Sequence, residues 1–232
     1  MKIGIFTDPH YSSQEITCKK RYNSRSLGKI REAYAEFVTL GCDAVICLGD
    51  LIDRETDHDA EIRNLKEIAA VIHAFPLKTV VVMGNHDAFC FTVEEFYQIL
   101  GDDCRPNPMQ TEKNTLLFLD ACHFTSGRHY APGDSNWKDT CYPHTDLLRE
   151  TLSHIETEVC ILMHQTIDPC GHSDHCLSNA AEIRAILEES GRVRKVLQGH
   201  YHPGMQSGKR GIHYITLPAM CENDHAYYTI TL

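Results

Sequence analysis

The sequence predicts a layered α/β fold in which mixed β-sheets are covered by helices. Short runs rich in β-branched residues alternate with segments of helical periodicity, and a length of 232 residues allows one large core. The chain opens as βαβαβ, with strands expected in residues 2–7, 43–49 and 79–84. We therefore expect residues 1–232 to form a single domain.

The remaining elements follow from periodicity and from end signals. The first helix is expected over residues 26–41, because Gly41 is a typical C-terminal cap. Thr92, with Glu95 three residues later, predicts a capped helix over EEFYQIL. Other helices are expected from about Asp59 to His73, near His144 to Ile155 and near Ala180 to Glu189, and other strands in NTLLFLDA, EVCILMH, RKVLQGH, IHYITLP and AYYTITL.

Composition narrows the possible partners. The chain has 22 basic and 32 acidic side chains and a formal charge of -10, without a long basic run, so no nucleic-acid partner is expected. No apolar stretch reaches the roughly 18 to 20 residues of a membrane span, so we expect no membrane partner and a cytoplasmic location. The 11 cysteines are scattered and odd in number, which disfavours a secreted disulfide framework. Nothing in the pattern indicates an oligomeric state.

Polar residues follow the strong predicted strands at their carboxyl ends. In α/β sheets these ends meet in a shared crevice, where such folds place their ligands. We therefore expect side chains that are remote in sequence to converge there. They are Asp8, His10, Asp50, Asp53, Asn85, His86, His164, His200 and His202.

These residue types are those of a two-metal site. Imidazole suits Zn, Fe and Mn, a carboxylate can bridge two ions, and an amide oxygen adds a neutral ligand. Two divalent ions, two aspartates and one hydroxide sum to a formal charge of about +1, which attracts phosphate even in an acidic protein. The set contains no cysteine, which disfavours a structural zinc finger.

Each motif has a simpler interpretation when it stands alone. Asp8-Pro9 and Gly49-Asp50 are both common turn chemistry. GNHD is more specific, because a turn requires no histidine, and His200 and His202 would point the same way in an extended segment. All the motifs occur in order, each after a strand, which makes coincidence remote.

In these motifs the chain resembles the calcineurin-like metallophosphoesterases, whose series runs D-x-H, GD-x-x-D, GNH[DE], H and GH-x-H. The matching segments are DPH, GDLID, GNHD, the histidine of LMHQ, and GHYH, which span residues 8–202. The resemblance implies a four-layer α/β/β/α sandwich with two mixed sheets flanked by helices. It also implies two divalent ions (Mn, Fe or Zn) and hydrolysis of a phosphoester by a hydroxide that bridges them.

The same resemblance implies a role for each residue. One ion would be held by Asp8, His10, Asp50 and His202, and the other by Asp50, Asn85, His164 and His200. His86 would face the substrate phosphate and protonate the leaving oxygen, oriented by Asp53. For Asp53 the alternatives are a helix N-cap or a partner for Arg54. Cys90 is interpreted as a packing thiol.

Looser similarities involve the ADP-ribose/CDP-alcohol diphosphatases of this superfamily. KKRYNSRSLGKIREAYAEF resembles their RRYYRxSL helix start, with Asn23 in place of an aromatic residue, and DPCGHSDHCLSNAAEIRAIL resembles a later loop. This implies a small nucleotide-type substrate such as ADP-ribose or a CDP-alcohol. Residues implied to line its pocket are Tyr11, Arg21, Arg25, Cys176 and Asn179, although Arg21 and Arg25 could be solvated charges at a helix start.

Other functions remain alternatives. A cyclic-nucleotide phosphodiesterase would carry the same motif series. A phosphoprotein phosphatase is disfavoured, because Glu55 follows Arg54 where GDxVDRG requires glycine. A non-catalytic scaffold on this fold ranks below the enzymes, because every ligand and His86 are present.

Two polar segments lie outside the motifs. Thr125 to Tyr142 is rich in turn residues and is expected to form a long surface loop, a type that is often functional. CGHSDHC could suggest a separate zinc site made of Cys170, His172, His175 and Cys176. Its spacing is too compressed for a finger, so we favour a loop beside the active centre.

Overall fold

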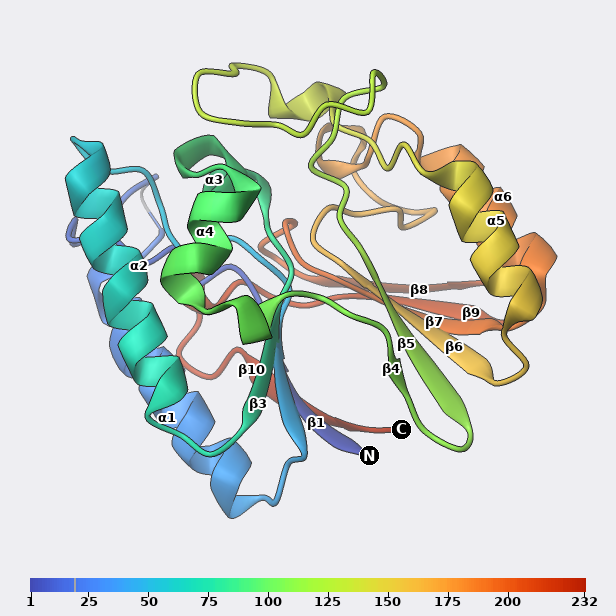
Figure 1. The fold of residues 1–232 in the computed structure, drawn as a ribbon, viewed down its shortest axis with the longest axis horizontal. Coiled ribbons are helices and arrows are strands. Elements are labelled where there is room, and N and C mark those ends of the chain that lie inside the picture. Colours follow the sequence, from blue (N-terminus) through green and yellow to red (C-terminus); the bar gives the residue numbers. More distant parts are fainter. Residues whose placement is uncertain (19) are drawn as a thin grey trace.

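The computed structural model describes residues 1–18 and 20–232 (Figure 1). Two β-sheets pack face to face, and helices cover the outer face of each sheet. This arrangement confirms the expected α/β/β/α sandwich with two mixed sheets.

The first sheet consists of β1 (Lys2–Phe6), β2 (Ala44–Cys47), β3 (Lys78–Val81) and β10 (Tyr227–Thr231). Its order is β10-β1-β2-β3, in which only β10 is antiparallel to its neighbour. Its outer face, on the left of Figure 1, is covered by α1 (Ser26–Thr39), α2 (His58–His73), α3 (Asn85–Cys90) and α4 (Val93–Leu100).

The second sheet consists of β4 (Met109–Gln110), β5 (Asn114–Leu119), β6 (Glu158–Met163), β7 (Val193–Gln198), β8 (Met205–Lys209) and β9 (Ile212–Thr216). Its order is β4-β5-β6-β7-β9-β8, with a parallel centre and antiparallel edge strands. Its outer face is covered by α5 (Thr145–His154) and α6 (Ala180–Ser190).

The layer between the sheets explains why the central strands are apolar on both faces. Ile3, Ile46 and Val80 of the first sheet and Leu162 and Leu197 of the second belong to one buried cluster. The opposite faces of these strands pack against helices, so β2 is buried along its whole length. Such strands read as continuous apolar runs rather than as alternating patterns.

Most expected elements form near their predicted bounds. α1 is followed by Gly41 at φ 67, the left-handed conformation of a C-terminal cap. Asp57 caps α2 by accepting a hydrogen bond from the backbone N–H of Ala60. Thr92 likewise accepts a hydrogen bond from the backbone N–H of Glu95.

Apart from short 3₁₀ turns, three elements were not expected from the sequence: the two-residue edge strand β4, the helix α3 and the strand β8. The short helix α3 begins at Asn85, because the side chain of Asp87 accepts a hydrogen bond from the backbone N–H of Gly84 and closes its first turn. The strand β8 contains no β-branched residue and forms by antiparallel pairing with β9. Its existence therefore depends on the partner strand rather than on its own propensity.

The loop that follows β5 crosses the upper part of Figure 1, above the strand ends. Within the expected segment 125–142, the only helical turn in the described residues is a 3₁₀ turn at Trp137–Asp139. The segment is not wholly on the surface, because Tyr130 and Cys141 are buried. The loop is thus packed against the core near its start, at Tyr130, and at its end, at Cys141.

All eleven cysteines are free thiols, and burial raises the pKa of the Cys90 thiol well above its usual range. Among the described residues we find no helix with the length and apolar character needed to cross a membrane.

The close approach of β1 to α1 is testable at Gly4. A Cβ placed on Gly4 would lie 2.5 Å from the Phe37 ring, so Gly4→Ala is expected to lower the free energy of unfolding by about 1–3 kcal/mol. Urea denaturation measures the change. The matched control is Gly28→Ala, where a Cβ meets nothing within 4 Å and the helix should gain about 0.5–1 kcal/mol. Equal stability of the two variants would contradict the packing described here.

Candidate metal centre and active site

Side chains from both sheets converge at the carboxyl ends of the strands. Asp8 follows β1, Asp50 follows β2, Asn85 follows β3, His164 follows β6 and His200 follows β7. The sandwich brings these ends to the same edge of the molecule. Residues separated by more than a hundred positions therefore become neighbours.

A first group of donors surrounds the Asp8 carboxylate. The Nε2 atoms of His10 and His202 lie 3.1 Å apart. Each is close to Asp8 Oδ1, at 3.5 Å for His10 and 3.4 Å for His202. His10 Nε2 also lies 3.4 Å from Asp50 Oδ2. Four donor groups thus face one small volume.

A second group meets on the other side of Asp50. His164 Nε2 lies 3.2 Å from Asp50 Oδ2 and 3.2 Å from Asn85 Oδ1. A ligand atom of His200 lies within 4.8 Å of those of Asp50 and His164. The Asp50 Oδ2 atom is therefore shared between the two groups, as expected of a carboxylate that bridges two ions.

The hydrogen bonding of these residues fits cation ligands. Asp8 Oδ1 and His200 Nε2 are buried and have no hydrogen-bond partner among the described residues. An unsatisfied buried acceptor is costly unless a cation compensates it. His164 Nδ1 lies 2.8 Å from the Leu48 carbonyl, and His202 Nδ1 lies 2.6 Å from Glu222 Oε1. These contacts orient both rings and leave Nε2 to act as the ligand atom.

The backbone is strained where the donors converge. Asp8, His10, Asp50 and His200 have positive φ values of 51, 46, 52 and 67. Each such residue costs about 1–3 kcal/mol and persists only where the surrounding structure imposes it. Gly84 must lack a side chain for a separate, steric reason, because a Cβ there would overlap the Asp50 carboxylate. Such clustering of strain is typical of a functional site.

The charges of the site favour cations. Burial lowers the pKa of His164 and His202, yet Asp50 outweighs it and raises the pKa of His164 to about 9, while Asp8 raises that of His202 to about 11. Burial raises the pKa of Asp50, but His164, His86 and His10 hold it well below its usual range. Burial likewise raises the pKa of Asp8, but His10 and His202 hold it well below its usual range, so the carboxylates of Asp8 and Asp50 both stay anionic and attract positive charge.

His86 lies beside the donors and is held by Asp53. Its Nδ1 is 2.8 Å from Asp53 Oδ1, and its ring meets the His10 ring edge-on with centroids 4.5 Å apart. Asp53 Oδ2 in turn accepts hydrogen bonds from Thr17, Arg21 and Asn23. Burial lowers the pKa of His86, but Asp50 and Asp53 outweigh this effect and raise it. The ring therefore favours its protonated form.

The alternatives for Asp53 find no support in this geometry. The N-cap of α2 is Asp57. Asp53 Oδ1 does accept a hydrogen bond from Arg54, but from its backbone N–H rather than from its guanidinium group.

Comparison with known proteins decides the family. Residues 1–204 match the family model described as calcineurin-like phosphoesterase. The chain belongs to this family. It is accordingly a phosphoric ester hydrolase that uses two divalent metal ions, and the convergent histidine and aspartate groups agree with that.

Two relatives of this calcineurin-like phosphoesterase cover most of its length. A manganese-dependent ADP-ribose/CDP-alcohol diphosphatase from Danio rerio is 23% identical and covers 99% of this chain and 91% of its own. The 3′,5′-cyclic adenosine monophosphate phosphodiesterase CpdA from Haemophilus influenzae is 24% identical, over 95% of this chain and 77% of its own. The resemblance to the diphosphatases is thus confirmed at the level of family.

Solved structures share the fold. A dimetal phosphatase from Danio rerio superposes with a TM-score of 0.84 at 21% identity, covering 100% of this chain and 92% of its own. A phosphopantetheinyl hydrolase from Mycobacterium tuberculosis gives a TM-score of 0.58 at 11% identity, over 95% of this chain and 90% of its own.

A pocket of about 340 Å³ opens over the candidate ligands of this phosphoesterase. Of the five residues proposed to line a substrate pocket, only Arg21 is among its lining residues. Tyr11 bonds to Glu67, Arg25 stacks over the Tyr22 ring, Cys176 accepts a hydrogen bond from Thr166, and Asn179 holds both backbone groups of Tyr142. Substrate contact by these four stays a prediction that the geometry does not support.

The pocket wall contains residues that the motifs did not reveal. Trp137, His175 and Tyr201 line the pocket, and the rings of Trp137 and His175 lie 4.8 and 5.1 Å from the His200 ring. His175 belongs to the CGHSDHC segment, which therefore lies beside the active centre as expected. Trp137 is the single tryptophan of the chain, in a polar loop, and this was a usable signal. Glu222 had none.

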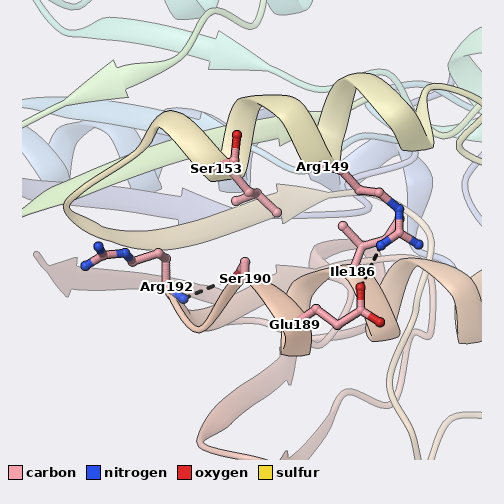
Figure 2. Close-up of a pocket in the computed structure, with 7 residues that line it drawn as sticks. Arg149, Ser153, Ile186, Glu189, Ser190 and Arg192 are labelled. Carbon is pink, nitrogen blue, oxygen red and sulfur yellow. Dashed lines mark hydrogen bonds and ion pairs between the residues drawn. The ribbon is translucent and has the colours of Figure 1, made fainter.

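A second hollow, of about 420 Å³, lies between the carboxyl ends of α5 and α6 (Figure 2). Its Arg149 is paired with Glu189 at 2.6 Å, and the Ser153 and Arg192 side chains also line it. It contains none of the metal-ligating groups described above, so we assign the phosphoesterase chemistry to the strand ends.

The contact of Glu222 with His202 predicts a measurable effect on metal affinity. Glu222→Gln removes the carboxylate that orients the His202 ring, and affinity for Mn²⁺ is expected to fall about 10- to 100-fold. Competition with a fluorescent chelator measures it. Glu189→Gln, in the remote hollow, is the matched control and should leave the affinity unchanged. Equal affinity in the two variants would show that Glu222 does not support the site.

Proposed function

We propose that the protein hydrolyses the diphosphate bond of a small nucleotide derivative such as ADP-ribose or a CDP-alcohol. The proposal depends mainly on one observation: His86, paired with Asp53, lines the same pocket as several candidate ligands, Arg21 and aromatic side chains. The Danio rerio relative, named as a diphosphatase, supports it by covering nearly the whole chain.

We assign the metal ligands as two sets that share Asp50. One set is Asp8, His10, Asp50 and His202, and the other is Asp50, Asn85, His164 and His200. When bound, two divalent ions supply Lewis-acid stabilisation of phosphoryl oxygens and lower the pKa of water. The facing Nε2 atoms and the shared Asp50 oxygen support this division.

His86 is proposed as the general acid. Its Nδ1–H donates to Asp53, so Nε2–H is the proton available to the substrate. As the phosphorus–oxygen bond to the leaving group breaks, His86 would give that proton to the leaving oxygen and stabilise the negative charge beforehand. Asp53 would keep the ring oriented and cationic, assisted by Thr17 and Asn23.

Cationic side chains on the pocket wall support a diphosphate rather than a single phosphodiester as the substrate. A diphosphate carries one more phosphoryl group, and Lys20 and Arg21 place cationic side chains on the pocket wall. The rings of Trp137 and Tyr201 offer surfaces on which a nucleobase can stack.

Cyclic-nucleotide hydrolysis is the second candidate. It is supported by the Haemophilus influenzae relative, which is named as a cyclic adenosine monophosphate phosphodiesterase and matches 95% of this chain.

We further propose that residues 1–232 act as a single domain, since both sheets contribute to one inter-sheet core. A cytoplasmic location is proposed from the free thiols.

A substrate panel tests the proposed function. With added Mn²⁺, kcat/KM for ADP-ribose or CDP-choline is expected to exceed that for 3′,5′-cyclic AMP at least about tenfold, a difference of about 1.4 kcal/mol. Released nucleotide is measured by chromatography. Loss of activity with a chelator and its return with Mn²⁺ is the control. A preference for cyclic AMP would overturn the proposal in favour of the second candidate.

The pairing of His86 with Asp53 predicts a change in the pH profile. Because Asp53 raises the pKa of His86, and the acid form is active, activity falls as pH rises through that pKa. Asp53→Asn should therefore move the alkaline limb of the kcat profile to lower pH. His86→Ala should lower kcat about 100- to 10,000-fold with both ions retained.

Asp57→Asn is the matched control for this experiment, because Asp57 caps α2 and asparagine is an equally good cap. Its alkaline limb should coincide with that of the wild type. If Asp53→Asn also left the limb in place, His86 would not be the acid.

A further inference from the structure

A second cluster of metal-ligating side chains lies after β5, apart from the residues described above. Asp120 directly follows this strand, and His123 and His129 belong to the loop that continues from it. Each residue offers one ligand atom, and these atoms lie within 4.8 Å of one another. The calcineurin-like motif series includes none of them.

The donor atoms are spaced as ligands of one ion. His129 Nε2 lies 3.2 Å from Asp120 Oδ2, and His123 Nδ1 lies 3.9 Å from Asp120 Oδ1. Bonds of about 2.0–2.2 Å to a central ion place neighbouring donors about 3–4 Å apart. The three side chains therefore need only small rotations to share a cation.

The His129 ring and the Asp120 carboxylate are each oriented by a second hydrogen bond. His129 Nδ1 lies 2.6 Å from the Tyr130 carbonyl, which fixes the proton on Nδ1 and leaves Nε2 free to bind. Asp120 Oδ1 accepts a hydrogen bond from the backbone N–H of Cys122 at 3.0 Å. The contact partners that metal-binding histidines and carboxylates usually have are thus already present.

An ordinary ion pair explains only part of this arrangement. Protonated His129 could pair with Asp120 without any metal. That pair leaves His123 Nδ1 buried and without a hydrogen-bond partner among the described residues. Since buried polar atoms are nearly always satisfied, this nitrogen points to a further ligand. The Asp120 side chain is 36% exposed, so an ion can reach the cluster.

The backbone holds the cluster together across the base of the loop. His123 forms isolated β-bridges with His129 and with Cys141. The Cys141 backbone N–H donates to the His123 carbonyl at 2.7 Å, and that of Tyr130 donates to the Cys122 carbonyl at 2.7 Å. The donors are therefore brought together before any ion binds.

We propose that Asp120, His123 and His129 form a third, mononuclear site for a divalent transition metal, with zinc as the reference ion. Two imidazoles and one carboxylate suit zinc, iron or manganese, and they leave a coordination position for water. The site goes beyond the proposed function and does not depend on which phosphoester is cleaved.

The proposed ion would anchor the loop that forms one wall of the active site. Tyr130, next to His129, and Trp137, further along the loop, line a hollow of about 220 Å³ with His86 and Arg54. An ion that links Asp120 to His129 would fix the position of Tyr130, which is the next residue in the chain and lines this wall. Its role would be to position the wall rather than to take part in the chemistry.

Metal stoichiometry tests the proposal. Protein is loaded with Zn²⁺ and dialysed, and zinc per chain is counted by inductively coupled plasma mass spectrometry. His129→Gln and His123→Gln are each expected to bind one ion fewer than the wild type. His144→Gln is the matched control, because this exposed ring lies edge-on to His123 at 5.5 Å but is not in the cluster. Equal zinc content in the wild type and both cluster variants overturns the proposal.

Trp137 provides a readout that is independent of turnover, because it is the only tryptophan of the chain. The last equivalent of Zn²⁺ should shift the emission of the wild type and of His144→Gln, but not that of the cluster variants. An identical shift in every protein would also overturn the site. Should a cluster variant fail to fold, zinc anomalous diffraction from the wild type decides: a peak beside Asp120 supports the proposal, and its absence refutes it.

Discussion

The buried carboxylate of Asp50 is the group on which the arrangement of this site depends. It is 1% exposed, and an anion in such a place is tolerated only when cations and hydrogen bonds surround it. Oδ2 lies 3.4 Å from His10 and 3.2 Å from His164, while Oδ1 accepts the backbone N–H of His86 at 2.8 Å. One side chain thus links the donors of the first sheet to those of the second.

The surroundings of Asp50 separate two tasks. Histidines that are oriented through Nδ1, such as His164 by the Leu48 carbonyl and His202 by Glu222, turn Nε2 towards the buried carboxylates. His86 also has a carboxylate on Nδ1, as His202 does, but its partner Asp53 is itself held by three donors. The Nδ1 partner alone therefore does not separate the two roles. The Nε2 atom of His202 faces His10 and Asp8, which suits metal binding, whereas the firmly held pair of Asp53 and His86 suits proton donation.

The loop after β5 forms part of the wall of the active-site pocket. It carries Trp137 against His200, and its base is closed by the backbone pairing of His123 with His129 and Cys141. The same loop is held at its far end by Asn179, which bonds to both backbone groups of Tyr142. Residues that resemble substrate ligands in the sequence can thus act by holding the wall of the pocket.

The sequence by itself determined the layered α/β class, the position of most helices and strands, and the set of candidate metal ligands. These depend on local signals: Gly41 ends α1 through its own backbone freedom, and Asp8, Asp50, Asn85, His164 and His200 each follow an apolar strand. Tertiary structure alone decided β8, the support of His202 by Glu222 and the contacts of Tyr11, Cys176 and Asn179. The physical reason is that periodicity and caps are encoded by neighbouring residues, whereas hydrogen bonds between remote segments exist only after the sheets have packed.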